Sequence, residues 1–135
     1  MALSAQRQFL VSISGIDGYF MTKSGGEVSA EATKVYEGGA KTPVIITAPA
    51  DVDNITISRN YDPERDATVL SALRAKVGVE TKTVTVQPTD RDLVASGSPI
   101  VYAEAVLVRI GEPEFDANSG DMATYELEFA VKTVA

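Results

Sequence analysis

Residues 122–134 alternate between apolar and polar side chains with the two-residue period of a β-strand. An extended chain would divide them into an apolar set of Tyr125, Leu127, Phe129 and Val131 and a polar set of Thr124, Glu126, Glu128 and Lys132. At about 3.3 Å per residue the segment would extend roughly 43 Å, about twice the length of an ordinary strand. Strands of this length are typical of a barrel, a tall sandwich or a sheet shared between subunits.

Further segments have the composition or the alternation of strands, and these are residues 7–14, 19–22, 27–37, 54–59, 81–87 and 100–110. Glycine-containing turns are expected at Gly15, Asp17-Gly18, Ser24-Gly25-Gly26 and Gly38-Gly39. The inward-facing residues predicted on these strands include Phe9, Val11, Ile13, Ile55, Ile57, Val84 and Val86.

One helix is predicted over residues 63–77. Asp62 can cap its first N–H groups, and Pro63 suits the first helical position. Its apolar face consists of Val69, Leu70, Leu73 and Val77, with Asp66 on the same side. The sequence therefore predicts one domain over residues 1–135, mainly β, built as a sandwich or partial barrel of antiparallel strands with one packed helix.

The composition removes large classes of chemistry. The chain has no cysteine, which excludes disulfides and thiolate chemistry, and no histidine, which most catalytic bases and zinc sites use. We therefore expect no enzymatic activity, no cofactor and no metal. The sequence has no 18-residue apolar run, and its first residues lack the apolar segment of a secretory signal. We therefore expect a protein that is made in the cytoplasm and is not inserted into a membrane.

The net charge of −7 is concentrated near the C-terminus. Residues 1–60, 61–99 and 100–135 carry formal charges of −1, −1 and −5. An acidic protein of this kind is not expected to bind nucleic acid by neutralising phosphates. The simplest interpretation is a solvated face that keeps a β-rich protein soluble and protects its edge strands.

Residues 40–53 form an unusually long connection for a small domain. Pro43 and Pro49 would interrupt strand pairing on either side of the apolar run Val44-Ile45-Ile46. Two interpretations are open for this run. It is either a short strand buried within the domain or a surface arm that is buried against another chain.

Four groups of residues could in principle form sites. Residues 116–121 carry the alternating oxygen ligands of a calcium loop, but Leu127 stands where the bidentate glutamate is needed, so we expect an acidic turn. The glycine pairs lack the ending of a phosphate loop. Arg59, Tyr61 and Asp62 either form a small polar site or shape a strand-to-helix junction. Glu126 and Glu128 resemble a glycosidase carboxylate pair, although both would lie on one strand.

The order of these elements resembles that of the tail tube proteins of tailed bacteriophages. The most specific part is Val35-Tyr36-Glu37-Gly38-Gly39, a long loop, and then Asn54-Ile55-Thr56-Ile57-Ser58-Arg59. It is similar to the "glycine pair, loop, I-T-L-x-R" segment of that family. Here Ile57 stands where leucine is common, and Asn60-Tyr61 stand where a glycine often follows the arginine.

The resemblance implies a virion protein that forms stacked hexameric rings around a channel for genome delivery, with long strands contributing to a ring-shaped inner barrel. The loop at about residues 38–53 would then reach the adjacent ring through Val44, Ile45 and Ile46. The predicted lumen-lining residues are Thr124, Glu126, Glu128, Lys132, Glu27 and Glu31. An acidic wall would let DNA pass without specific binding.

The implied partners are other copies of this chain and the tape measure, terminator and distal tail proteins. The alternatives to a tube subunit are a tail terminator or another virion ring protein, and a monomeric β-sandwich module that binds carbohydrate or protein. A carboxylate enzyme using Glu126 is a third.

Overall fold

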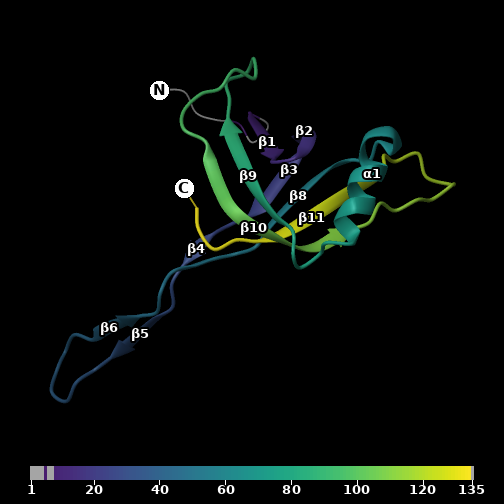
Figure 1. Cartoon of the computed structure of the whole chain (residues 1–135). Coiled ribbons are helices and arrows are strands. Elements are labelled where there is room, and N and C mark those ends of the chain that lie inside the picture. Colours follow the sequence, from purple (N-terminus) through teal and green to yellow (C-terminus); the bar gives the residue numbers. More distant parts are fainter. Residues whose placement is uncertain (1–4, 6–7, 135) are drawn as a thin grey trace.

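The protein is a curled antiparallel sheet from which a long arm projects (Figure 1). The computed structural model describes residues 5 and 8–134. In this part of the chain the strands and the helix are β1 (Phe9–Ile13), β2 (Ile16–Phe20), β3 (Thr22–Gly25), β4 (Val28–Ser29), β5 (Ala32–Val35), β6 (Val44–Thr47), β7 (Asp51–Val52), β8 (Ile55–Asn60), α1 (Pro63–Arg74), β9 (Thr81–Pro88), β10 (Ile100–Gly111) and β11 (Thr124–Ala130). The mainly β fold with one helix is as predicted.

The main sheet closes on itself. It has seven strands in the order β2-β1-β9-β10-β11-β8-β3, so its two edge strands are β2 and β3. These are consecutive in the chain and are separated by Met21 alone, whose N–H donates to the carbonyl oxygen of Ser58 at 2.8 Å. Since one bent segment supplies both edges, the sheet forms a barrel and leaves little free edge.

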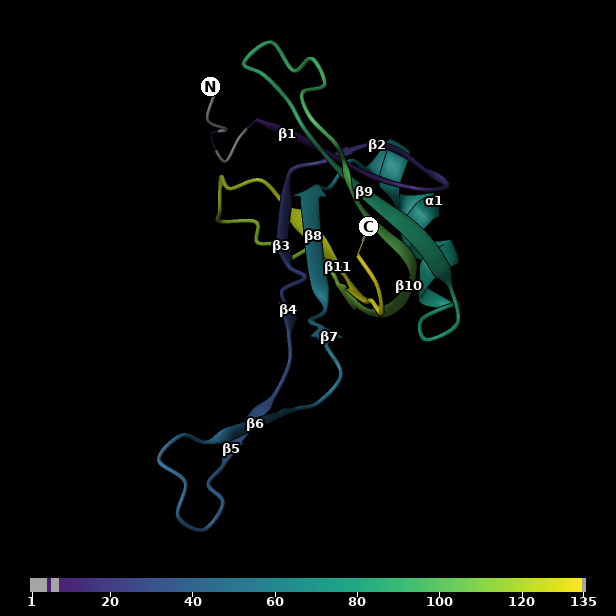
Figure 2. The same cartoon turned by 90° about the vertical axis from the view of Figure 1, so that its left-hand side faces the viewer.

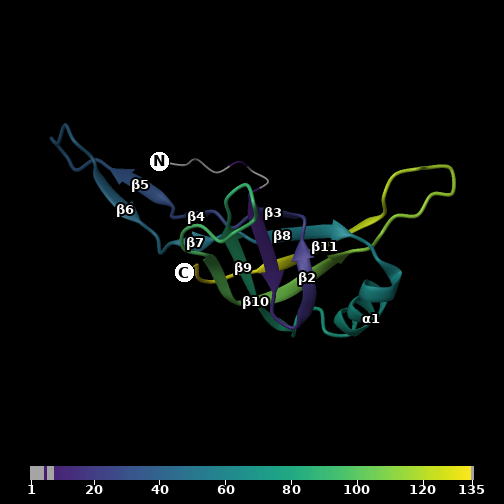
Figure 3. The ribbon, with the colours of Figure 1, turned by 90° about the horizontal axis from the view of Figure 1, so that it is seen from above.

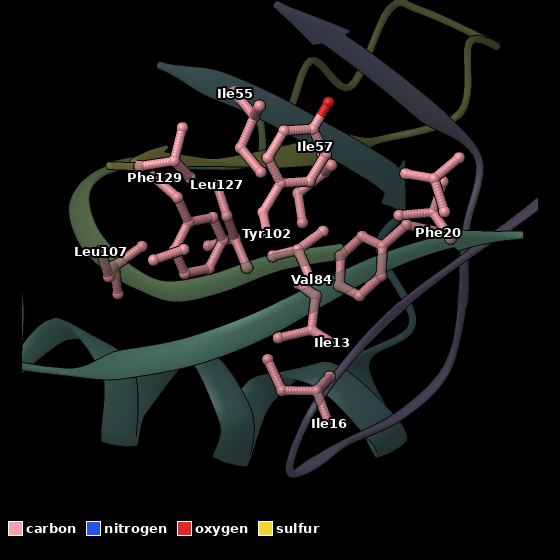
Figure 4. Close-up of a cluster of buried hydrophobic side chains, with 14 of the residues drawn as sticks. Ile13, Ile16, Phe20, Ile55, Ile57, Val84, Tyr102, Leu107, Leu127 and Phe129 are labelled. Carbon is pink, nitrogen blue, oxygen red and sulfur yellow. The ribbon is translucent and has the colours of Figure 1, made fainter. Parts of the chain in front are cut away.

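The core lies inside this curled sheet. Figure 4 shows Phe20, Ile57, Val84, Tyr102 and Leu127 converging there from different strands. The predicted inward residues of β8, β9 and β11 are buried, and Ile55, Ile57, Val84, Leu127 and Phe129 have no exposed surface. The alternation of the sequence therefore assigns the two faces of these strands correctly.

Helix α1 packs against the barrel through Leu70 and Leu73, which belong to the same buried cluster. Asp62 caps it as predicted, because its side chain accepts a hydrogen bond from the Glu64 N–H at 3.1 Å. The helix ends at Arg74 instead of residue 77, and Val77 is 42% exposed. The chain turns earlier because the Gly78 N–H donates to the Leu107 carbonyl of β10 at 2.7 Å.

Two predicted turns are wrong. Asp17-Gly18 lies inside β2, because Ser14-Gly15 makes the turn that pairs Ile13 with Ile16. Ser24 and Gly25 belong to β3, where Gly25 has a φ of 82° and a Cβ atom there would collide with the Asn54 carbonyl oxygen. Tertiary pairing thus overrides the local turn signal of these dipeptides.

The closing strand is shorter than predicted. β11 has seven residues instead of thirteen, because its partner β8 supplies register partners only for Thr124 to Phe129. At about 3.3 Å per residue it extends roughly 23 Å, an ordinary strand length.

The arm runs from β4 to β7 and leaves the barrel as a hairpin (Figures 2 and 3). Its two ladders pair β4 with β7 and β5 with β6. The strand predicted at 27–37 is therefore split into β4 and β5, and the predicted loop at about 38–53 contains β6 and β7. Residues 44–46 are not a buried strand of the domain, because all of β6 is exposed.

Candidate functional site

A buried ionic cluster joins β8, β11 and α1. Arg59 is 2% exposed, and its guanidinium Nη2 lies 2.6 Å from Oδ1 of Asp66, which is fully buried. The Tyr125 hydroxyl accepts from Arg59 Nε at 2.6 Å and donates to Asp66 Oδ1 at 3.0 Å. Arg59 Nη1 also donates to the Asp17 carbonyl at 2.7 Å, which ties β2 to the same cluster.

The environment shifts the pKa of two members of this cluster. Burial alone would raise the pKa of Asp66, but hydrogen bonds from Arg65, the Asp62 N–H and Tyr125, together with the charge of Arg59, lower it to about 2. Burial raises the pKa of the Tyr125 hydroxyl to about 12, against the opposing hydrogen bond from Arg59. Asp66 is therefore ionised and Tyr125 protonated at neutral pH.

The cluster is structural. Asp62 caps the helix, and Tyr61 packs edge-to-face on Tyr125 at a centroid distance of 6.2 Å. Of the two interpretations of Arg59, Tyr61 and Asp62, the strand-to-helix junction is therefore the one that the structure supports. The sequence placed Asp66 on the apolar face of the helix, but it did not reveal that Asp66 is the ionic partner of Arg59.

The outer face of the sheet carries a second cluster, around Arg109 of β10. Its Nη2 lies 2.7 Å from Glu126 Oε1 and its Nε lies 3.1 Å from Glu128 Oε1. Asn54 donates a hydrogen bond to Glu128 Oε2 at 2.9 Å. The pKa of Glu128 is lowered, mainly by this hydrogen bond and secondly by the one from Arg109. Glu126 and Glu128 thus face one guanidinium together, not two sides of a cleft.

The other predicted lumen residues are spread over the molecule. Thr124 is exposed on the same strand as Glu126. Lys132 follows the end of β11, and its Nζ lies 2.6 Å from Oε2 of Glu104. Glu27 lies at the root of the arm, directly before β4, and Glu31 lies between β4 and β5. Their carbonyl oxygens accept hydrogen bonds from the N–H groups of Asp53 and Ala48. These two glutamates thus lie on or beside the arm and not on β11 itself.

The outer half of the arm, residues 32–47, has one apolar face. Residues directly opposite each other in an antiparallel pair share a face, so the register divides β5 and β6 into two sets. One set is Thr33, Val35, Val44 and Ile46, and the other is Ala32, Lys34, Ile45 and Thr47. Val44, Ile45 and Ile46 are 51%, 58% and 57% exposed. Ile45 therefore points away from the face that its two neighbours share.

The loop at residues 112–123 forms the end surface of the barrel, and it contains the predicted acidic turn. Asp116 accepts the Asn118 N–H through its side chain at 2.9 Å and the Ser119 N–H through its carbonyl at 3.1 Å. In the described residues no three acidic side chains are grouped so as to hold a metal ion. Likewise, no helix in residues 8–134 is long and apolar enough to span a membrane.

Comparison with known proteins identifies the fold. No family model and no curated protein matches this sequence. Among solved structures, a chain in the PVC sheath/tube terminator of an extracellular contractile injection system, in the extended state, is 21% identical with a TM-score of 0.84. That match covers 100% of this chain and 96% of that chain.

Two further structures give the same answer. A chain in the anti-feeding prophage tube-terminating cap is 19% identical, with a TM-score of 0.83 over 100% of this chain and 91% of that chain. A chain in the PVC sheath-tube complex in the extended state is 20% identical, with a TM-score of 0.79 over 98% of this chain and 90% of that chain. This protein therefore has the fold of chains found in the tubes and tube ends of contractile injection systems.

Proposed function

We propose that this protein is the repeated structural subunit of a tube, in a phage tail or a related contractile particle, and that it forms hexameric rings which stack around a channel. The observation that carries the proposal is the arm. Both of its outer strands are exposed, and its apolar face would be costly to leave in water. A second copy of the chain would bury that face. The fold shared with chains of tube assemblies supports the same conclusion.

In this proposal β11 contributes to the inner barrel of the ring, and Thr124, Glu126, Glu128 and Lys132 face the lumen. Glu27 and Glu31 would line it only near the root of the arm. DNA would pass without specific binding, because the described lining residues offer no cation free of a carboxylate. The partners would be further copies and the tape measure, terminator and distal tail proteins of a virion assembled in the host cytoplasm. The role is structural, with no catalysis.

The field of such a lining would be weaker than the charge of the whole chain implies. Arg109 with Glu126 and Glu128 carries +1 − 2 = −1, so six copies carry 6 × −1 = −6. Six whole chains carry 6 × −7 = −42. Lys132 is cancelled by Glu104, and Glu27 and Glu31 add −2, so the whole lining carries −1 − 2 = −3 per copy and 6 × −3 = −18 per ring. The lining is therefore acidic, but it would repel DNA less strongly than the charge of the whole chain implies.

A terminator is the second candidate, because two of the three similar chains come from structures of a cap or a terminator. A terminator would form single rings that do not polymerise. Negative-stain electron microscopy of the purified protein separates the possibilities. We expect rings with a central channel that stack into tubes as the concentration rises. Single rings at every concentration would favour the terminator, and a monodisperse monomer at high concentration would overturn both in favour of a binding module.

A further inference from the structure

The arm consists of two halves that are held in different ways. Figures 2 and 3 show the inner half, β4 with β7, next to the barrel and the outer half, β5 with β6, beyond it. The two halves are separate two-stranded ladders, and neither belongs to the seven-stranded sheet. The arm therefore has two junctions, one at its root on the barrel and one between its halves.

The root of the arm is closely packed. Gly25 and Gly26 have φ values of 82° and 81°, and a Cβ atom on Gly26 would lie 2.6 Å from the hydroxyl oxygen of Tyr102. Tyr102 is 2% exposed. The Lys23 ammonium group lies 5.1 Å from the centroid of its ring and donates to the Gly25 carbonyl at 2.9 Å. Since Val52 of β7 also belongs to the buried cluster, the barrel fixes the direction of the inner half.

The junction between the halves has unequal numbers of residues on its two strands. The inner ladder ends with the pair of Ser29 and Asp51, and the outer ladder begins with the pair of Ala32 and Thr47. Two residues lie between these pairs on the first strand of the hairpin, and three lie between them on the second. The second strand therefore carries one extra residue, which is a β-bulge.

This bulge lacks the bonds and contacts that stiffen a strand. The Ala48 N–H donates to the Glu31 carbonyl at 2.9 Å and extends the outer ladder by one pair. Ala30 then lies opposite both Pro49 and Ala50, where the proline offers no N–H and the alanines offer only a methyl group to pack. The structure describes every residue from 27 to 51, and none of these side chains is buried. Within the described chain the junction is therefore held by its backbone alone.

We propose that this bulge, at residues 30–31 and 48–50, is a joint about which the outer half of the arm moves as a preformed hairpin while the inner half stays fixed to the barrel. A bulge interrupts the ladder and bends the strand that carries it, so the hairpin yields there first. The motion redirects the apolar face of Val35, Val44 and Ile46 without any change in the core. The inference goes beyond the proposed function because it concerns a single subunit. Failure to form rings would overturn that function and leave the joint standing.

Spin labels can measure the joint directly, because the sequence has no cysteine of its own. Ser71→Cys on α1 gives a reference label on the barrel, while Ser29→Cys and Thr33→Cys label the inner and outer halves of the arm. All three side chains are exposed, so the labels should not disturb the core. Distances are measured by double electron–electron resonance below the concentration of assembly, in an excess of unlabelled protein.

The two distances should differ in their spread. We expect a narrow distribution from residue 71 to residue 29 and a distribution at least about twofold broader from residue 71 to residue 33. Equal widths for the two distances would overturn the joint, whether both are narrow or both are broad.

A second pair of labels separates a moving hairpin from an unfolded one. Thr33→Cys and Thr47→Cys lie at diagonal positions of β5 and β6, one register pair apart. Their labels should broaden each other's continuous-wave spectrum in frozen solution, because the two strands stay paired. Absence of this broadening would mean that the outer half is unfolded, and it would overturn the proposal.

Removal of the bulge should stiffen the arm. Deletion of Ala50 together with Pro49→Thr leaves two residues on each strand and restores the missing N–H, so the two ladders can join into one. The distribution from residue 71 to residue 33 should then become as narrow as that from residue 71 to residue 29. A distribution that stays broad in this variant would show that the motion lies elsewhere.

Two glycines provide a matched test of the root. Gly26 and Gly39 both have a φ of 81°, but a Cβ atom on Gly39 would meet no atom within 4 Å. Gly26→Ala should therefore broaden the distribution from residue 71 to residue 29, whereas Gly39→Ala should leave it narrow. An equal response to both substitutions would contradict a root fixed by packing. Circular dichroism checks that Gly26→Ala folds, and if it does not, the unmodified arm and the bulge deletion decide the proposal.

Discussion

Arg59 and Arg109 lie on the two strands that flank β11, and each contacts carboxylates, but from opposite faces of the sheet. Arg59 is the register partner of Tyr125 and is 2% exposed. Arg109 is the register partner of Glu128, and 48% of its side chain is exposed. A guanidinium thus pairs with a carboxylate once in the buried interior and once in contact with water.

The difference teaches that environment decides what an ion pair does. Inside, no water can replace a lost partner, so the members of the buried cluster fix the junction of β2, β8 and α1. Outside, water competes for every charge, and the pair contributes little to stability. The outer cluster instead determines how much charge the surface presents.

The largest effect is expected from breaking the buried cluster. Asp66→Asn leaves the charge of Arg59 buried without an ionised partner and should lower the free energy of unfolding by about 3–5 kcal/mol. Urea unfolding at neutral pH, below the concentration of assembly, measures it. Glu126→Gln is the matched control, because it neutralises one carboxylate beside Arg109, and it should cost less than about 1 kcal/mol.

Equal losses of unfolding free energy in Asp66→Asn and Glu126→Gln would contradict the difference between the buried and the exposed cluster. A further variant tests whether the loss comes from the unpaired buried charge. Arg59→Met, Asp66→Leu and Tyr125→Phe together should recover most of the lost stability, since apolar residues of similar volume often replace a buried ion pair at little cost and the Tyr125 hydroxyl is not left buried without partners.

Acid should reproduce part of this effect. The pKa of Asp66 is about 2 in the folded protein against an ordinary 3.8, so the ionised carboxylate favours the folded state. Its contribution of roughly 2 kcal/mol is present above about pH 4 and is lost as the pH falls toward 2. The difference in unfolding free energy between the wild type and Asp66→Asn should therefore narrow between pH 5 and pH 2. A constant difference would show that another group carries the acid response.

The smallest effect on the free energy of unfolding is expected from the exposed cluster around Arg109. Arg109→Ala should lower the free energy of unfolding by less than about 1 kcal/mol, because its carboxylate partners regain water. The same urea experiment measures it. A loss above about 2 kcal/mol would mean that the outer cluster is structural too.

Sequence reasoning succeeded where the environment of a residue is set within its own strand. The two-residue period of β8, β9 and β11 separated core from surface, and the Asp62-Pro63 signal located the start of α1. The buried cluster also left a signal. Arg59 continues the inward series of Ile55 and Ile57, and Asp66 lies on the apolar face of the helix, so two opposite charges occupied core positions.

What could not be predicted depends on pairing between distant segments. The length of β11 is set by β8, and the position of the first turn is set by the pairing of Ile13 with Ile16. The outer cluster joins Arg109 of β10 to Glu126 of β11, and a twelve-residue loop separates these two strands in the sequence. A local pattern contains none of these partners.

The root of the arm has a consequence for how such a protein can change over evolution. β3 and β8 pair directly, from Gly25 opposite Ile55, so the chain leaves the barrel and returns at the same point. Loop closure costs only about 0.6 kcal/mol per doubling of length, and a four-residue turn in place of residues 26–54 would alter it by about 1.7 kcal/mol. The arm is therefore a module whose length and contacts can diverge between lineages while the barrel that carries it stays the same.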